Sequence, residues 1–327
     1  MNVFFDKDAD LALVRSRRVA VIGYGNQGRA QALNLRDSGV DVTIALPEQS
    51  RRRDQAREDG FAVFTTAEAA GRADLLVLLA ADEDHARIYS EEIEPNVRDG
   101  AAILFAHGLS IRFGLIVPRA DLDVLLVAPK GPGTALRSEY QAGAGLIALY
   151  AVGQDATGTA SGLALSYAAA LGSGRAGILP TTFAEESEAD LFNEQAVLWG
   201  AIPELIHAGF ETLVEAGFSP EVAYFECLTE VKLLADLIYA RGIAGMREAI
   251  SNTAEFGALE GGTRIVTPET RAEMRRILAE VRSGRFVDGL MADASAGYPR
   301  LRASRADAAA HPIEQVGQRL RGLTGKA

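Results

Sequence analysis

The chain has 327 residues, 48% of them hydrophobic and 24% charged, with a formal net charge of −11 and a single cysteine, Cys227. This length suffices for two domains, and one cysteine excludes an internal disulfide, so we expect a cytoplasmic protein in a reducing compartment. The negative charge argues against a nucleic-acid surface, and no apolar run approaches the roughly 20 residues that span a bilayer. We therefore expect neither a nucleic acid nor a membrane as a partner.

The first half of the chain alternates short apolar runs with helical stretches. Continuous apolar runs are typical of strands in a sheet that is covered on both faces. The alternation predicts an α/β, Rossmann-type domain with a doubly wound, mostly parallel sheet over residues 1–181. The predicted strands are 19–23, 42–46, 75–79, 101–105, 124–128 and 146–152.

The second half is predicted to be helical. No strand is expected beyond about Gly174, and Thr182 with Glu185 forms a capping box that begins the first helix. We predict an all-α domain over residues 182–327, and we expect its part after Gly284 to be ordered only in part. The predicted helical segments are 183–208, 220–241, 244–256 and 268–282.

A glycine-rich run follows the first predicted strand and opens the first long helix: Gly23-Tyr24-Gly25-Asn26-Gln27-Gly28. The first glycine permits a tight turn, the second lets the backbone approach a pyrophosphate, and the third lets the helix pack closely on the strand. The helix N-terminus also favours anionic phosphates. The run predicts a dinucleotide site, and the alternative is a glycine-rich turn that binds nothing.

The residues after the second predicted strand bear on the choice between NAD and NADP. Glu48 lies twenty residues after Gly28, where an acid usually binds the ribose hydroxyls of NAD. The arginines of the run Ser50-Arg51-Arg52-Arg53 follow at once and suit the 2′-phosphate of NADP. We favour NADP, with NAD as the alternative; the arginines otherwise form a solvated helix start.

Two pairs of carboxylates occur within predicted helices, Asp190 with Glu194 and Glu226 with Glu230. Residues four apart lie on one helix face, and the apolar neighbours of the second pair predict that at least one of its glutamates is buried. A buried carboxylate requires a cation or a proton. Oxygen ligands without a Cys or His cluster suit Mg²⁺ or Mn²⁺, and the alternative is an ion pair with arginine or lysine.

Two further side chains follow predicted strands, where the ligand sites of α/β sheets collect. His107 precedes a glycine, and Lys130 lies in the rigid run Pro129-Lys130-Gly131-Pro132-Gly133. The lysine suits a proton donor or a charge partner for a substrate oxygen, and the alternative is a surface lysine on a turn. We favour an interpretation of Glu186 as a first-turn acid near the positive helix end, and the alternative is a group that supports the metal ligands without binding the metal. We assign no function to His85, His207 and His311.

These stretches, taken in order, resemble the ketol-acid reductoisomerase family over nearly the whole chain. So many motifs in one order form a highly specific signal, and the length is similar to that of the short class with one helical domain. Besides the glycine run, the matching motifs are Phe105-Ala106-His107-Gly108, Val127-Ala128-Pro129-Lys130-Gly131-Pro132-Gly133, Arg137-Ser138-Glu139-Tyr140, Asp190-Leu191-Phe192-Asn193-Glu194-Gln195, Tyr224-Phe225-Glu226-Cys227-Leu228-Thr229-Glu230, Ile250-Ser251-Asn252-Thr253-Ala254-Glu255 and His311-Pro312-Ile313-Glu314.

The resemblance implies two Mg²⁺ ions, with Asp190 bridging them and Glu194 binding one. Glu226 and Glu230 would complete the site from a second subunit. The active unit would then be at least a homodimer, and a dodecamer is compatible with this. The resemblance also implies a knotted helical domain and places Gly133 beside the cofactor.

The implied reaction begins with a small 2-acetohydroxy acid, either 2-acetolactate or 2-aceto-2-hydroxybutyrate. An alkyl group migrates with the help of the metal, and NAD(P)H then reduces the new ketone to a 2,3-dihydroxy acid in valine and isoleucine biosynthesis. Lys130 and Glu230 would handle protons, with His107 near them. Ser251 would hold the substrate carboxylate.

Leu198 and Trp199 fall on the substrate pocket of the family, where Cys or Leu is common at the second position. Because pockets respond to one methylene by ~1–3 kcal/mol, the tryptophan raises the alternative of a paralogue with an altered substrate in specialised metabolism. The glycine run would also suit a metal-independent hydroxy-acid dehydrogenase or a non-catalytic dinucleotide-binding protein. The presence of Lys130, Ser251 and all four helical carboxylates argues against the non-catalytic protein.

Overall fold

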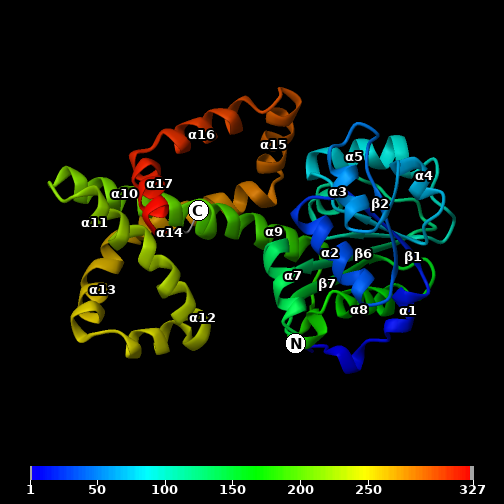
Figure 1. Ribbon diagram of the computed structural model, residues 1–327, viewed down its shortest axis with the longest axis horizontal. Helices are drawn as coiled ribbons and strands as arrows, with labels where there is room; N and C mark the ends of the chain where they lie inside the picture. The colour runs from blue at the N-terminus through cyan, green and yellow to red at the C-terminus, as the bar shows by residue number, and fades with distance from the viewer. Residues whose placement is uncertain (1, 325–327) are drawn as a thin grey trace. The chain divides into compact units, whose positions relative to one another are not determined.

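The computed structural model describes residues 2–324, which form two compact units that divide after Ala189 (Figure 1). This division lies inside helix α9 (Phe183–Asn193), which is continuous across it. The boundary predicted after residue 181 lies just before the same helix.

The N-terminal unit is built on one eight-stranded sheet with the order β3-β2-β1-β4-β5-β6-β7-β8. Neighbouring strands are parallel except β6 and β7, which run antiparallel. The doubly wound, mostly parallel α/β architecture is therefore confirmed. The strands are β1 (Arg18–Ile22), β2 (Asp41–Ala45), β3 (Ala62–Phe64), β4 (Leu75–Leu78), β5 (Ala102–Phe105), β6 (Asp123–Pro129), β7 (Ala148–Gln154) and β8 (Ile178–Pro180).

Both faces of the sheet are covered, as the continuous apolar strands predict. Val19 and Val21 of β1 point into one hydrophobic cluster, which also contains residues of α1, α2 and α8. Ala20 and Ile22 point into a second cluster on the opposite face, which contains residues of α4, α5 and the start of α9. The helices of this unit are α1 (Leu11–Arg15), α2 (Asn26–Asp37), α3 (Arg52–Glu58), α4 (Thr66–Ala70), α5 (His85–Ile88), α6 (Leu109–Arg112), α7 (Gly133–Gln141) and α8 (Ala160–Ala170).

Two strands escape the sequence prediction. Strands β3 and β8 are three residues long, too short for an apolar run to stand out. The expectation that strands end near Gly174 is therefore wrong, because β8 pairs in parallel with β7. Phe4 also forms an isolated bridge with Ile178 of β8.

The C-terminal unit is helical, as predicted. Its small core contains Phe210, Ala223, Tyr224, Ile313 and Val316, from helices at both ends of the unit. The expectation of partial order after Gly284 is wrong for residues 285–324, because helices continue to Thr324; residues 325–327 lie outside the described part of the chain. After α9 the helices are α10 (Ala201–Glu215), α11 (Pro220–Tyr224), α12 (Glu230–Ala249), α13 (Asn252–Ile265), α14 (Pro268–Arg282), α15 (Arg285–Ser295), α16 (Pro299–Ala310) and α17 (Pro312–Thr324).

Two segments of this unit are π-helical, Glu194–Leu198 after α9 and Phe225–Thr229 after α11. They divide two of the long helices that the sequence predicts. Single π turns inside helical runs are uncommon and occur often at functional sites. Each of these two segments contains one of the predicted metal ligands.

Among residues 2–324, no helix is long and apolar enough to cross a membrane.

Candidate active site

The glycine run forms the turn between β1 and α2, as predicted. Gly23 has a φ of 101°, and a Cβ atom at this position would lie 2.6 Å from the carbonyl oxygen of Leu79. A Cβ atom on Gly28 would lie 2.3 Å from the Gly23 carbonyl oxygen, so both positions require glycine. The turn therefore brings the N-terminus of α2 against the strand ends, where backbone N–H groups favour a phosphate.

A cleft of about 420 Å³ lies beside this turn. Its walls come from the glycine run, one side of α2, the first turns of α3 and one side of α7 along its length. The start of α7 lies close to the glycine run, because a Cβ atom on Gly133 would lie 2.1 Å from the Asn26 carbonyl oxygen. Among the predicted cofactor residues, Tyr24, Gly25, Asn26, Arg52 and Gly133 line the cleft.

The residues after β2 divide into two groups. Glu48, Arg51 and Arg52 are exposed and accessible to a ligand, and Ser50 is half-buried. Arg53 is used differently, because its guanidinium donates to the carbonyl oxygens of Leu46 (2.7 Å) and Phe64 (3.3 Å). It ties the ends of β2 and β3 together, so its guanidinium is engaged with the protein's own backbone.

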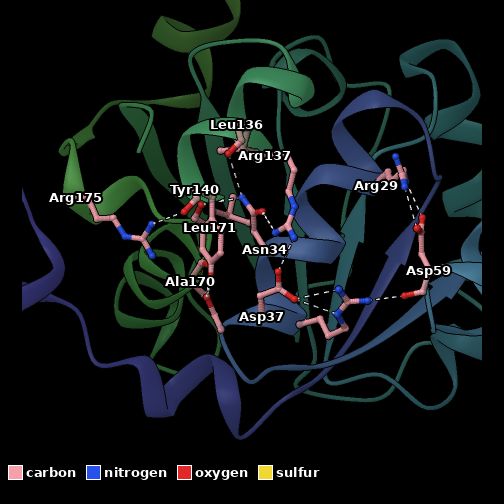
Figure 2. A network of polar contacts seen from close by, with 12 residues as sticks. Arg29, Asn34, Asp37, Asp59, Leu136, Arg137, Tyr140, Ala170, Leu171 and Arg175 are labelled. Carbon is pink, nitrogen blue, oxygen red and sulfur yellow. Dashed lines mark hydrogen bonds and ion pairs between the residues drawn. The ribbon is translucent and has the colours of Figure 1, made fainter. Parts of the chain in front are cut away.

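A polar network holds the walls of the cleft in place (Figure 2). Asp59 accepts from two Arg29 guanidinium nitrogens, at 2.7 and 2.9 Å, and from the Tyr24 hydroxyl at 2.8 Å. The Arg29 hydrogen bonds hold the pKa of Asp59 below its ordinary value. Asp37 accepts from Arg137 at 2.6 Å, which joins α2 to α7. These contacts fix two arginines that line the cleft.

Lys130, His107 and Glu186 meet at the carboxyl ends of β5 and β6. The Lys130 Nζ atom donates to Glu186 Oε1 at 2.8 Å, and His107 Nδ1 lies 3.1 Å from Glu186 Oε2. The backbone N–H of Gly108 donates to the same Oε2 at 2.8 Å. Glu186 does lie in the first turn of α9, but it is 1% exposed and its carboxylate also joins the two catalytic candidates, which the sequence interpretation missed.

The charge of Glu186 depends on these partners. Burial acts to raise the pKa of the carboxyl group, but the hydrogen bond and charge of His107 and the charge of Lys130 outweigh it and lower the pKa to about 2. A carboxylate buried without such partners would be protonated or would destabilise the fold. Glu186 is therefore ionised and oriented, and in turn it holds the Lys130 ammonium in place.

Helix α9 carries the first predicted metal ligand one turn beyond Glu186. His107, Glu186 and Asp190 offer nitrogen and oxygen atoms that all lie within 4.8 Å of one another. Asp190 and Glu194 are both half-buried. Asp190, near the end of α9, and Glu194, at the start of the π-helical segment that follows, offer the carboxylate oxygens that suit a hard divalent cation such as Mg²⁺.

Glu226 and Glu230 lie on exposed surface in this chain, so the prediction that one of them is buried is wrong for the single subunit. Ser251 is also exposed, and its hydroxyl accepts from the Ala254 N–H as the N-cap of α13. Leu198 and Trp199 are 42% and 69% exposed. The side chains of these predicted metal and substrate residues are therefore all exposed within the single subunit.

Comparisons with known proteins give two family matches that together span most of the chain. The family "Acetohydroxy acid isomeroreductase, NADPH-binding domain" matches residues 13–177, and "Ketol-acid reductoisomerase, C-terminal domain" matches residues 183–325. Among solved structures, an NADH-preferring ketol-acid reductoisomerase from an uncultured archean is 43% identical, with a TM-score of 0.96 over 99% of both chains.

More distant structures share the fold alone. A putative oxidoreductase from Jannaschia sp. CCS1 is 18% identical, with a TM-score of 0.61 over 82% of this chain and 97% of its own. A semialdehyde dehydrogenase NAD-binding protein from Cupriavidus necator is also 18% identical, with a TM-score of 0.58 over 82% of this chain and 99% of its own.

The buried Glu186 carboxylate predicts a specific acid sensitivity of the metal-free protein. Since its folded pKa of about 2 lies below the ordinary 4.5, ionisation contributes stability above about pH 4.5 that is lost as the pH falls towards 2. We expect Glu186→Gln to lower the free energy of unfolding at pH 7 by about 3 kcal/mol and to flatten its decline over this window.

The measurement is denaturant unfolding at several pH values with a chelator present. The exposed Glu185→Gln, on the same helical turn, serves as the control and should follow the parent. Parallel curves for the parent and Glu186→Gln would contradict the assignment.

Proposed function

The chain belongs to the ketol-acid reductoisomerase family, and from this premise we propose how its residues divide the work of the reaction. The enzyme isomerises a 2-acetohydroxy acid and reduces the product with a nicotinamide cofactor, in branched-chain amino acid biosynthesis. The contact of Lys130 and His107 with the buried Glu186 carries the assignment of catalytic groups. Neither a metal-independent dehydrogenase nor a non-catalytic binding protein needs this arrangement beside a helix bearing two further carboxylates.

Lys130 is the proton-handling group of this set. Its ammonium donates to Glu186 through one of three N–H groups, so another can donate a hydrogen bond to a substrate oxygen. His107 contacts the other carboxylate oxygen of Glu186, Oε2. Glu230 is proposed as the second proton-handling group, and Ser251 as the donor to the substrate carboxylate.

We propose that Mg²⁺ is held by Asp190 and Glu194 of one subunit with Glu226 and Glu230 of a second. The all-oxygen donor set and the half-buried positions of Asp190 and Glu194 support this choice. When bound, the metal supplies Lewis acidity that polarises the ketone and lowers the pKa of the hydroxyl. The protein's part is to hold the substrate oxygens in one orientation before alkyl migration.

Self-association is supported by the surface of the helical unit. Helices α12 and α13 are 20 and 14 residues long, and none of their residues, all of them described, is buried. Their exposed side chains include Leu233, Tyr239, Phe256 and Leu259. Because isolated helices are marginal in water, these two need apolar cover, and a second copy that also receives Glu226 and Glu230 provides it. We propose at least a homodimer.

NADPH is the proposed cofactor, although the archaeal relative is described as NADH-preferring. The support is local: Arg52 lines the cleft, and its NH1 atom would lie 3.3 Å from a Cβ atom on Gly25 of the glycine run. Arg51 is exposed beside it. The opposing feature is Glu48, which suits the ribose hydroxyls of NADH.

The proposed function predicts metal-dependent turnover of 2-acetolactate. Oxidation of NADPH and, separately, NADH should proceed with Mg²⁺ and stop when a chelator removes it, because the isomerisation requires a Lewis acid. Absorbance at the nicotinamide band follows the reaction. Turnover that persists in chelator would instead support a metal-independent dehydrogenase.

Arg52→Ala tests the cofactor proposal. Loss of a charged hydrogen bond to the 2′-phosphate should lower kcat/KM with NADPH roughly tenfold or more, whereas kcat/KM with NADH should change little. Arg57→Ala on the same helix, whose guanidinium pairs with Asp54 at 2.9 Å, is the matched control. An equal fall in kcat/KM with both cofactors would show that Arg52 does not act through the 2′-phosphate.

Mixing two inactive variants tests the shared metal site. Asp190→Asn and Glu226→Gln should each abolish turnover, and in a symmetric dimer the mixed pair retains one intact site. Random exchange of subunits should then restore about a quarter of the parent activity. If the mixture stays inactive after subunit exchange has been verified, the four carboxylates do not come from two chains.

Trp199→Cys tests the substrate pocket. If the indole borders the substrate, its removal should change the ratio of rates on 2-acetolactate and 2-aceto-2-hydroxybutyrate roughly tenfold, because the two differ by one methylene. An unchanged ratio would place Trp199, whose side chain is 69% exposed in the single subunit, outside the pocket.

A further inference from the structure

His85 is a buried polar residue to which the sequence assigns no role. It is the first residue of α5, in the segment that follows β4, and it is 3% exposed. Phe105 of β5 packs against its ring at a centroid distance of 6.2 Å. A histidine this deeply buried needs partners for both ring nitrogens.

Both nitrogens have partners, and the partners fix the tautomer. Nε2 lies 3.0 Å from the carbonyl oxygen of Ala80, and since a carbonyl only accepts, Nε2 carries the proton. Nδ1 lies 2.9 Å from the Ser110 hydroxyl, which therefore donates to the neutral ring. Burial favours this neutral form by lowering the pKa of His85, although Asp82 lies 3.6 Å from Nδ1.

The two partners belong to different loops of the site. Ala80 lies against the glycine run, where a Cβ atom on Gly23 would be 2.7 Å from the Ala80 nitrogen. Ser110 is fully buried in α6, two residues after Gly108, whose N–H donates to Glu186. One imidazole therefore connects the loop after β4, beside the cofactor turn, to the loop after β5, which carries His107.

The position of these loops in the sheet relates the His85 connection to the cofactor site. The chain order reverses between β1 and β4, and a dinucleotide in such a sheet binds across this point, with its two halves on opposite sides of the glycine turn. The β2 side carries Glu48 and Arg52, so the adenosine half of a bound dinucleotide would lie on that side. The loops after β4 and β5 therefore border the nicotinamide half.

We infer that His85 is a positioning residue that sets the nicotinamide-side loop at Ala80 in register with the Lys130–Glu186–His107 network. It touches neither substrate nor cofactor in this scheme, and it acts by holding two loops at a fixed separation. The inference rests on the proposed catalytic role of that network. Only a side chain with a donor and an acceptor at its far ends satisfies both loops, so glutamine is a conservative replacement and leucine is not.

The test uses the full-length enzyme with Mg²⁺ and NADPH, and 2-keto-3-hydroxyisovalerate as a substrate that needs reduction alone. His85→Leu should lower kcat for reduction about ten- to hundredfold, because small displacements of reacting groups carry costs of this size. Its dissociation constant for NADPH should stay within about threefold of the parent, because the glycine run still binds the phosphates. His85→Gln should recover most of kcat.

A double-variant comparison separates positioning from a general loss of packing. Ser110→Ala removes one of the two hydrogen bonds, so His85→Leu combined with Ser110→Ala should be no slower than His85→Leu alone. The inference is overturned if His85→Leu keeps the parent kcat, or if His85→Gln is folded, as judged by thermal unfolding, and as slow as His85→Leu.

A parallel measurement on Lys130→Met keeps this inference distinct from the proposed function. If Lys130→Met retains full turnover, the proposed catalytic network fails, and the positioning inference fails with it. If Lys130→Met is inactive while His85→Leu is fully active, the network stands and only the role of His85 is overturned.

Discussion

The site depends on one buried carboxylate. Glu186 is almost fully enclosed and remains ionised because an ammonium, an imidazole and a backbone N–H all face its two oxygens. Loss of the Lys130 ammonium would leave the carboxylate charge unbalanced in a place with little water, where the cost is several kcal/mol. Glu186 therefore holds the loops that carry Lys130 and His107 in fixed positions relative to the start of α9, and neither loop can shift alone.

A second constraint, close backbone contact, aligns the cofactor turn with these loops. Gly23 lies against the segment after β4, and Gly133 lies against Asn26, so the glycine run is enclosed by neighbouring backbone on two sides. The Gln27 amide adds a hydrogen bond to the Gly131 carbonyl at 2.9 Å, one residue from Lys130. The segment that receives the phosphates and the segment that presents the lysine are thus parts of one rigid arrangement, which favours a fixed path between cofactor and substrate.

The sequence predicts most of this fold because the relevant signals are local. Apolar runs predict six of the strands, and the glycine spacing predicts the turn before α2. Glu186 is misjudged because its partners lie 56 and 79 residues earlier in the chain, and helical spacing gives no information about them. Arg53 looks like a phosphate ligand for the same reason, since the carbonyl oxygens that it binds are adjacent only in the folded sheet.

The helical unit shows a different limit on prediction from one chain. The apolar residues around Glu226 and Glu230 predict that this segment is buried. Within residues 2–324, however, no other part of the chain buries those two glutamates. Helical periodicity reports that a face is apolar, and it does not report whether the covering surface belongs to the same subunit. The exposed side chains of α12 and α13 favour a second copy, because a 20-residue helix with no buried residue lacks the packing that stabilises helices in proteins. The carboxylates and the apolar surface thus share one explanation: assembly would bury both together, and a metal ion would then balance the charge that burial brings.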